Sequence, residues 1–247
     1  MRPYLLRHPR PGRTITSRFP DTRISVLEAL RRPDPDQRRH AAELLIRAYR
    51  APILATLAWR WNLQPADAED LTQGFFAAAL EKEWFERFDP ARGRFRTFVR
   101  VAADRFAANA AQSAGRLKRG GDSVTISLDD LQDLVPRADE EIEERFRAEW
   151  VRSIFELALN ALREEAGARQ RQTQLQLFEA YDLLDDERPT YAALGEQFGL
   201  NPSEVINHLA WARRRFRTHV LDVIRQLAGS EAEYREDVRD LLGIEAP

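Results

Sequence analysis

Helical periodicity is the feature that most constrains the fold of this chain. Apolar residues recur at three- and four-residue steps over most of its 247 residues. Stretches that alternate apolar and polar residues, as a half-buried strand does, are nearly absent. The pattern therefore predicts an all-α protein.

Two helical domains joined by a flexible linker are expected. Residues 120–138 have a mixed polar composition with Pro136 and read as that linker. The first domain, residues 19–119, is expected to be a small bundle, and Pro52 should kink or split its long second helix. Its helices are predicted at residues 21–31, 37–61, 66–85 and 96–117.

The second domain is expected over residues 139–229, followed by an acidic C-terminal helix over 230–247. Helices are predicted at 140–167, 169–184 and 191–198, and one more begins at Pro202. The last two are separated by a short turn at Gly199 and Leu200. Two helices in this relation, the second one basic, indicate a helix-turn-helix over residues 190–217.

The stretch NPSEVINHLAWARRRFR, residues 201–217, begins like a well-capped helix. Asn201 can cap it, Pro202 suits the first turn, and Glu204 sits where a capping box places an acid. One apolar stripe follows, formed by Val205, Leu209, Ala212, Phe216 and Val220. The same helix carries arginines at 213–215 and 217, so a DNA-binding role is expected.

Charge is segregated along the chain, although the formal net charge is only −2. Residues 92–119 hold eight basic side chains and one acid, whereas residues 139–149 hold six acids and two arginines. Nearly all the positive charge is arginine, which suits phosphate binding, although a genome of high GC content would give the same bias. The basic stretch favours a nucleic-acid partner.

Several classes of function lack their required residues. There is no cysteine, and the four histidines, His8, His40, His208 and His219, show no ligand spacing, so no metal site is expected. A nucleophile–base pair and a phosphate-binding glycine loop are also missing. The chain is therefore expected to be neither an enzyme nor a cofactor-binding protein.

The sequence also bears on location. No apolar run approaches the roughly 18 residues of a membrane span. The first 20 residues are rich in arginine and proline but lack the apolar core of a signal peptide. We expect a cytoplasmic protein whose residues 1–18 form a disordered tail. A transit-like segment or a start codon assigned too far upstream are the alternatives.

The stretch PADAEDLTQGFFAAALEK, residues 65–82, places acids at the beginning of a helix. Asp67, Glu69 and Asp70 crowd its first turns, where negative charge offsets the helix dipole. Ordinary stabilisation of the helix end is one interpretation, and an acidic surface for a basic protein partner is another. A metal site is a third, for which three acids without histidine are weak evidence.

In the stretch FDPARGRFRTFVRVAADRF, residues 88–106, arginines alternate with phenylalanines. Arginine can contact phosphates, and an aromatic ring beside a Gly-Pro loop can stack on an unpaired base. In the alternative interpretation every phenylalanine is core and every arginine is solvated. Phe98 and Phe106 are expected in the core, and the residues around Phe95 remain open between the two.

These motifs together resemble the extracytoplasmic-function (ECF) group of the sigma-70 family, the bacterial RNA polymerase initiation factors. DAEDLTQGFF resembles the helix of that family that binds the polymerase clamp. DPARGRFRTFVRVAADRFAANAAQSAGRLKRGG resembles the segment that melts and reads the −10 promoter element. TYAALGEQFGLNPSEVINHLAWARRRFR aligns without gaps to the −35-reading helix-turn-helix.

The resemblance implies partners and residue roles. The partners would be promoter DNA and core RNA polymerase, through the clamp of its largest subunit and the flap of its second, and possibly an anti-sigma protein. The clamp would be contacted by Asp67, Glu69, Asp70 and Gln73. The −10 element would be contacted by Arg92, Arg94, Phe95, Arg96, Thr97, Arg100, Arg105, Arg116, Lys118 and Arg119. The −35 element would be contacted by Ser203, Ile206, Asn207, His208, Ala210, Trp211, Arg213, Arg214, Arg215 and Arg217.

The helix after Asn201 departs from the family in its first turns. Ile206, His208 and Trp211 stand where the family usually has lysine or arginine. In one interpretation the DNA is read with other chemistry, for instance Asn207 against adenine and Ala210 against a thymine methyl. In the other, −35 recognition is weak and this face binds a protein, with Trp211 as its anchor.

The C-terminal stretch SEAEYREDVRDLLGIEAP is predicted to form a helix with an apolar face and an acidic opposite face. The apolar face comprises Tyr234, Val238, Leu241 and Leu242. The helix would then pack on the second domain. A second hypothesis is that it competes with DNA for the arginine cluster of the preceding helix and acts as a self-inhibiting lid.

A sigma factor is the function that these features favour. A stand-alone helix-turn-helix regulator, which binds duplex DNA without polymerase, is the alternative. Such a regulator needs neither the acids at 67–70 nor the basic-aromatic loop. Since those acids are present, the sequence does not require phosphorylation of Thr72 for polymerase binding.

Overall fold

The computed structural model describes residues 25–117, 140–183 and 188–246, and its described residues form helices and connecting turns without a strand. The predicted all-α fold is confirmed. None of the described helices is long and apolar enough to cross a lipid bilayer. The expected N-terminal tail and the linker lie outside the described residues.

The described part of the first domain contains four α-helices and one turn of 3₁₀ helix. They are α1 (Val26–Leu30), α2 (Pro35–Arg60), α3 (Pro65–Glu81), η2 (Pro90–Arg92) and α4 (Phe95–Leu117). Long-range hydrogen bonds fix the segment between α3 and η2: the Arg31 side chain donates to the carbonyl oxygens of Glu86, at 2.7 Å, and Phe88, at 3.0 Å. This anchoring positions the loop that leads into α4.

Helix α2 continues through Pro52 without a break, so the expected split is absent. Pro52 is buried, and its neighbour Ile53 has no exposed surface. Proline removes one backbone hydrogen bond from a helix. Packing of α2 against the surrounding helices offsets this loss, because most helix stability in a protein comes from the buried face.

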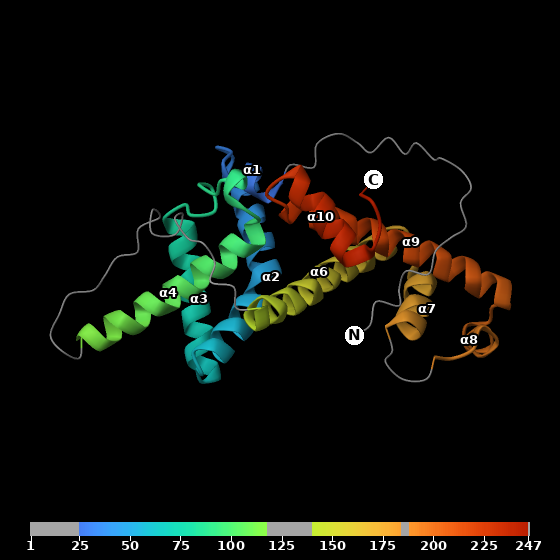
Figure 1. Cartoon of the computed structure of the whole chain (residues 1–247). Helices are drawn as coiled ribbons and strands as arrows, with labels where there is room; N and C mark the ends of the chain where they lie inside the picture. Colours follow the sequence, from blue (N-terminus) through green and yellow to red (C-terminus); the bar gives the residue numbers. More distant parts are fainter. Residues whose placement is uncertain (1–24, 118–139, 184–187, 247) are drawn as a thin grey trace.

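The second domain consists of α6 (Glu140–Ala168), α7 (Gln172–Asp182), α8 (Tyr191–Phe198), α9 (Pro202–Leu227) and α10 (Glu231–Leu242). The long helix α6 reaches back to the first domain and lies against α2, while its other end packs against α9 (Figure 1). Helix α10 returns over the beginning of α4, whereas α7 and α8 lie beside the N-terminal half of α9, away from α10 (Figure 1).

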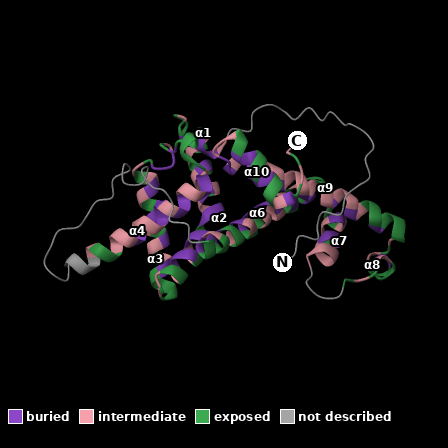
Figure 2. Cartoon of the chain, in the orientation of Figure 1, coloured by how far each residue is buried: buried purple, intermediate pink, exposed green. Residues whose placement is uncertain are grey.

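Apolar contacts join the two domains where α6 crosses α2. Tyr49 of α2 stacks on Phe146 of α6, with 6.4 Å between the ring centroids, and both rings are almost fully buried. Trp150, one turn further along α6, is buried as well. Buried residues continue from the first domain along α6 into α9 (Figure 2). The described parts of the two domains therefore share one hydrophobic core.

Candidate nucleic-acid interface

The acidic residues of α3 form an exposed face. Asp67, Asp70 and Gln73 are exposed, and the N-cap residue Gln64 makes no side-chain capping bond. The Oε1 atom of Glu69 accepts from Gln73 Nε2 at 3.0 Å and pairs with Arg50 of α2. The hydrogen bonds from Gln73 and Arg50 lower the pKa of Glu69. Glu69 is therefore held in its ionised form beside the exposed side chains of Asp67 and Asp70.

Thr72 lies on the opposite side of α3. Its side chain is fully buried, and its hydroxyl donates to the carbonyl oxygen of Ala68 at 2.7 Å. A kinase could reach this hydroxyl only after local unfolding of α3. The folded chain therefore does not present Thr72 for phosphorylation.

A short, sharply turned loop leads into α4. The side chain of Asp89 accepts from the backbone N–H of Ala91 at 2.9 Å and so caps η2. Gly93 follows with φ of 142°, a conformation that side chains with a Cβ rarely adopt. The turn brings Arg92, which is exposed, and Arg94, which is half-buried, to the start of α4.

Phe95 is part of the core in this structure. It has no exposed surface and packs edge-on against Tyr49 and Phe88, with ring centroids 5.8 and 5.2 Å apart. Phe98 also contacts this cluster. The core interpretation of Phe95 describes this arrangement, and contact between Phe95 and a DNA base remains a prediction that requires the ring to become exposed.

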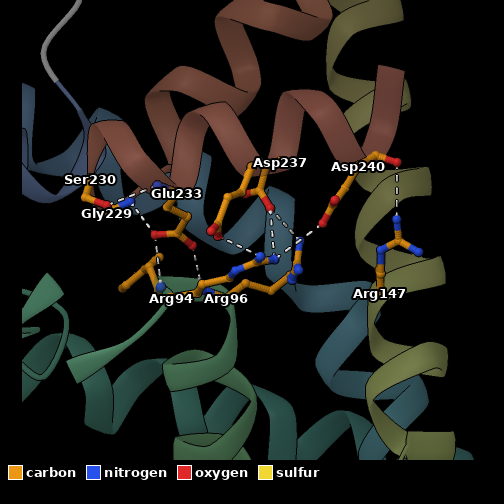
Figure 3. A network of polar contacts seen from close by, with 10 residues as sticks. Arg94, Arg96, Arg147, Gly229, Ser230, Glu233, Asp237 and Asp240 are labelled. Atoms are coloured by element: carbon orange, nitrogen blue, oxygen red, sulfur yellow. Dashed lines mark hydrogen bonds and ion pairs between the residues drawn. The ribbon is translucent and has the colours of Figure 1, made fainter. Parts of the chain in front are cut away.

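Arg94 and Arg96 point toward the acidic helix α10 (Figure 3), with Arg96 buried and the side chain of Arg94 34% exposed. Arg94 pairs with Glu236 at 2.6 Å and lies 3.5 Å from Asp240. Arg96, which is buried, pairs with Asp237 at 3.0 Å. Both predicted DNA-binding arginines are thus neutralised by carboxylates of the same chain.

The same helix also caps the beginning of α4. Glu233 accepts hydrogen bonds from the backbone N–H groups of Phe95, at 3.1 Å, and Arg96, at 3.4 Å (Figure 3). It accepts a third from Gly229 at 2.8 Å. The first N–H groups of a helix have no partner within it and attract anions. Glu233 therefore provides the anion at the N-terminus of α4.

The remaining predicted −10 residues differ in exposure. Arg100 is buried and pairs with Glu143 of α6 at 2.6 Å, whereas Thr97 and Arg105 are half-buried. The side chain of Arg116, and the whole of Lys118 and Arg119, lie outside the described residues. Helix α6 therefore covers part of the basic face of α4 by ion pairing.

Helices α8 and α9 form the expected pair with a tight turn. Thr190 caps α8, and Gly199 ends it in the left-handed conformation, with φ of 67°. Gly195 lies so close to the chain that a Cβ there would be 2.4 Å from the carbonyl oxygen of Leu200. Both glycines fix the angle at which α9 leaves the turn.

The predicted capping of α9 is confirmed. The Asn201 side chain accepts from Glu204 N at 3.0 Å, and the Glu204 carboxylate accepts from Asn201 N at 2.8 Å. The five residues predicted as its apolar stripe, Val205, Leu209, Ala212, Phe216 and Val220, are all buried. The other face of the first turns of α9 is thereby directed outward.

That outward face carries the residues predicted to contact the −35 element. Ser203, Ile206 and Asn207 are exposed, and Ile206 retains 49% of its surface. Ala210 and Trp211 are half-buried. The Nδ1 atom of His208 lies 2.9 Å from the side-chain amide of Gln174, so α7 fixes the orientation of this ring.

The arginine cluster of α9 is divided between internal pairing and exposure. Arg213 makes two hydrogen bonds to Asp182 of α7, at 2.8 and 3.0 Å, and Arg215 donates to Glu165 of α6 at 2.8 Å. Arg214 is exposed and Arg217 is half-buried. Two of the four arginines therefore contribute to packing between helices in this structure.

The acids of α10 that pair with Arg94 and Arg96 were not predicted from the sequence. The tail was expected to turn its acids away from its apolar face, yet Glu233 and Asp237 are buried together with Tyr234 and Val238. The arginines that α10 engages are those at the start of α4, not the cluster of α9. The four-residue spacing of Glu233 and Asp237 places both on one helix face and was the available signal.

The comparisons with known proteins bear on the first domain. Residues 45–117 match the family model for sigma-70 region 2. The matched stretch runs from within α2 to the end of α4 and includes the acidic face of α3. No curated protein and no solved structure matches the chain significantly. The first helical domain is therefore similar to sigma-70 region 2 over these residues.

Proposed function

We propose that the chain is a sigma factor of the ECF group, which binds core RNA polymerase and directs promoter recognition, promoter melting and transcription initiation. The match of residues 45–117 to sigma-70 region 2 is the observation that carries this proposal. Proteins of this family are transcription initiation factors and not enzymes. The chain would accordingly contribute binding and strand separation, while the polymerase supplies the chemistry.

The acidic face of α3 is the proposed contact with the basic clamp of the polymerase. Asp67, Asp70 and Gln73 are exposed together, and Glu69 is held ionised beside them. Complementary charge across an interface speeds association and fixes orientation. The flap of the second subunit would receive the second domain.

Promoter DNA would engage two surfaces. The start of α4 would read the separated strand of the −10 element, where arginines hold phosphates and extrusion of a base costs a few kcal/mol. The exposed first turns of α9 would read the −35 element. Asn207 can bond adenine there, and Ile206 can contact a thymine methyl.

Gel filtration with bacterial core polymerase tests the proposal. The wild-type chain should co-elute with the core enzyme, and Asp67→Ala/Asp70→Ala should weaken co-elution because it removes two exposed carboxylates. Glu144→Ala/Glu156→Ala is the matched control, since it removes two exposed carboxylates of α6. The control should co-elute like wild type.

Two outcomes would contradict the proposal. Absence of co-elution, together with binding of duplex DNA, would instead support a stand-alone helix-turn-helix regulator. Equal weakening by both double substitutions would show that the α3 face has no special role.

A further inference from the structure

The C-terminal helix α10 occupies the surface that the proposed function assigns to the promoter strand. We propose that α10 is an autoinhibitory element, whose carboxylates take the place of DNA phosphates at the beginning of α4 and must leave before the −10 element is read. This inference rests on the proposed function and adds a closed state to it. Helix α10 would then inhibit the chain from within, as an anti-sigma protein does as a separate molecule.

The first argument is the position of Glu233. A helix N-terminus with free backbone N–H groups is a ready binding place for a phosphate. At α4 that place is taken, because the Glu233 carboxylate accepts from the N–H groups of Phe95 and Arg96. A phosphate and Glu233 cannot occupy these donors together.

The second argument is the neutralisation of both arginines. Arg94 faces Glu236 and Asp240, and Arg96 faces Asp237, so the guanidinium groups that would bind phosphates are already paired (Figure 3). Arg96 also stacks on Trp150 of α6, with 4.5 Å from its guanidinium carbon to the ring centroid. DNA would have to displace the carboxylates that pair with both guanidinium groups.

The third argument is steric. A Cβ at Gly229, just before α10, would lie 3.2 Å from Phe95 Cβ and 2.5 Å from the ring of Phe88. The segment that leads into α10 therefore packs directly against Phe88 and the Cβ of Phe95. A promoter strand that enters at the start of α4 would have to displace this segment.

The attachment of α10 is partly apolar, which holds the closed state together. Tyr234, Val238 and Leu242 are buried, and the guanidinium of Arg225 in α9 lies 3.8 Å from the centroid of the Tyr234 ring. The polar contacts of α10 with the first domain are separate from these. They can be weakened by substitution while the apolar attachment to α9 is left intact.

The first experiment measures how α10 affects DNA binding. The full-length Glu233→Gln/Glu236→Gln variant loses two of the four carboxylates that face the start of α4, whereas Glu231→Gln/Glu245→Gln loses two exposed ones elsewhere in the tail. Both variants have the same net charge, so general attraction to DNA is matched. The probe is a fluorescent pool of short single-stranded DNA of randomised sequence, followed by anisotropy at neutral pH.

The first variant should bind this probe at least about tenfold more tightly than the control, because apparent affinity is reduced by the fraction of molecules that are open. Equal affinities of the two variants, both with wild-type circular dichroism, would overturn the proposal. That result would show that α10 is a permanent part of the fold and does not regulate DNA binding.

A second measurement follows α10 itself and keeps the native carboxylates. The chain has no cysteine, so spin labels can be placed at Ala91→Cys and Ala232→Cys, two exposed positions beside the loop and on α10. One short distance is expected in the free chain, and a longer one after core polymerase and the DNA pool are added. An unchanged distance in the polymerase complex would overturn the proposal even if the Glu233→Gln/Glu236→Gln variant does not fold.

The two proposals fail in distinguishable ways. Failure to bind core polymerase contradicts the sigma-factor function, and it leaves the DNA affinities of the two variants measurable without polymerase. Polymerase binding with α10 still docked contradicts autoinhibition alone.

Discussion

The Oε2 atom of Glu233 lies 3.1 Å from the backbone nitrogen of Phe95, a residue 138 positions earlier in the chain. This contact joins the C-terminal helix to the first turn of the helix that is proposed to read the −10 element. Helix α10 and a segment that matches the sigma-70 region 2 model are therefore joined in one structural unit. A substitution in α10 should therefore perturb the beginning of α4, and a substitution there should perturb α10.

The docking of α10 should depend on pH through Asp237. Burial raises the pKa of this carboxyl to about 6, and it outweighs the opposing effect of Arg96. Arg94 on the loop and Glu233 and Asp240 on α10 are the other charged groups that face it. When α10 is undocked the carboxyl is exposed, and its pKa returns to about 3.9.

The direction of this pH dependence follows from which state of α10, docked or undocked, binds the proton of Asp237 more tightly. Between about pH 4 and 6 the docked state of α10 holds more protons, so docking is strongest at the acid end and weakens as pH rises through 6. The difference between a pKa of about 6 in the docked state and about 3.9 in the undocked state limits this contribution to docking to roughly 3 kcal/mol. The free energy of undocking, obtained from the label distances between positions 91 and 232 in a urea series at each pH, should fall as pH rises over this interval, and Asp237→Asn should abolish the dependence. An equal dependence in the variant would assign it to another group.

Substitutions of the α9 arginines should have two different effects, one on stability and one on DNA binding. Arg213→Ala leaves the buried carboxylate of Asp182 without its partner, and it should lower the free energy of unfolding by about 1–2 kcal/mol, since Arg213 itself is partly exposed to screening solvent. Arg214→Ala/Arg217→Ala should leave stability unchanged. It should instead reduce the dependence of log affinity for promoter duplex on log salt concentration by about 2, because two phosphate contacts are lost.

Urea denaturation and binding titrations at several salt concentrations distinguish these outcomes. A loss of stability in Arg214→Ala/Arg217→Ala, with an unchanged salt dependence, would contradict the assignment.

Two glycines should respond oppositely to the same substitution. Gly195→Ala places a Cβ 2.4 Å from the carbonyl oxygen of Leu200, which is backbone and cannot move independently, so unfolding should become easier by about 1–3 kcal/mol. At Gly167 in α6 a Cβ meets nothing within 4 Å, and alanine there should stabilise by about 0.5–1 kcal/mol. Urea midpoints of both variants test this. A neutral Gly195→Ala would show that the turn between α8 and α9 is not so tightly constrained.

The helices and their local caps could be predicted from the sequence because both depend on near neighbours. Asn201 and Glu204 are three residues apart, so their capping box can be recognised within one short segment of the sequence. The buried stripe of α9 follows from its spacing alone. The split at Pro52 was the wrong one of the two predicted outcomes, because local chemistry disfavours proline in a helix while the packing that keeps α2 continuous comes from other helices.

The partners of the charged residues could not be predicted. Arg94 and Arg96 look identical in sequence to solvated, phosphate-binding arginines, and nothing near them specifies carboxylates about 140 residues away. Periodicity identifies the face that a helix buries, but it does not say which helix covers that face. The same limit applies to Arg213, whose partner Asp182 lies 31 residues earlier.

In vitro transcription from genomic DNA of the source organism tests directly whether the chain acts as a sigma factor. RNA 5′ ends are mapped after reaction of core polymerase alone, with the chain, and with Asp67→Ala/Asp70→Ala. The account predicts a set of start sites that arises only with the wild-type chain and shares upstream −10 and −35 sequences. Identical start sites with and without the chain would contradict it.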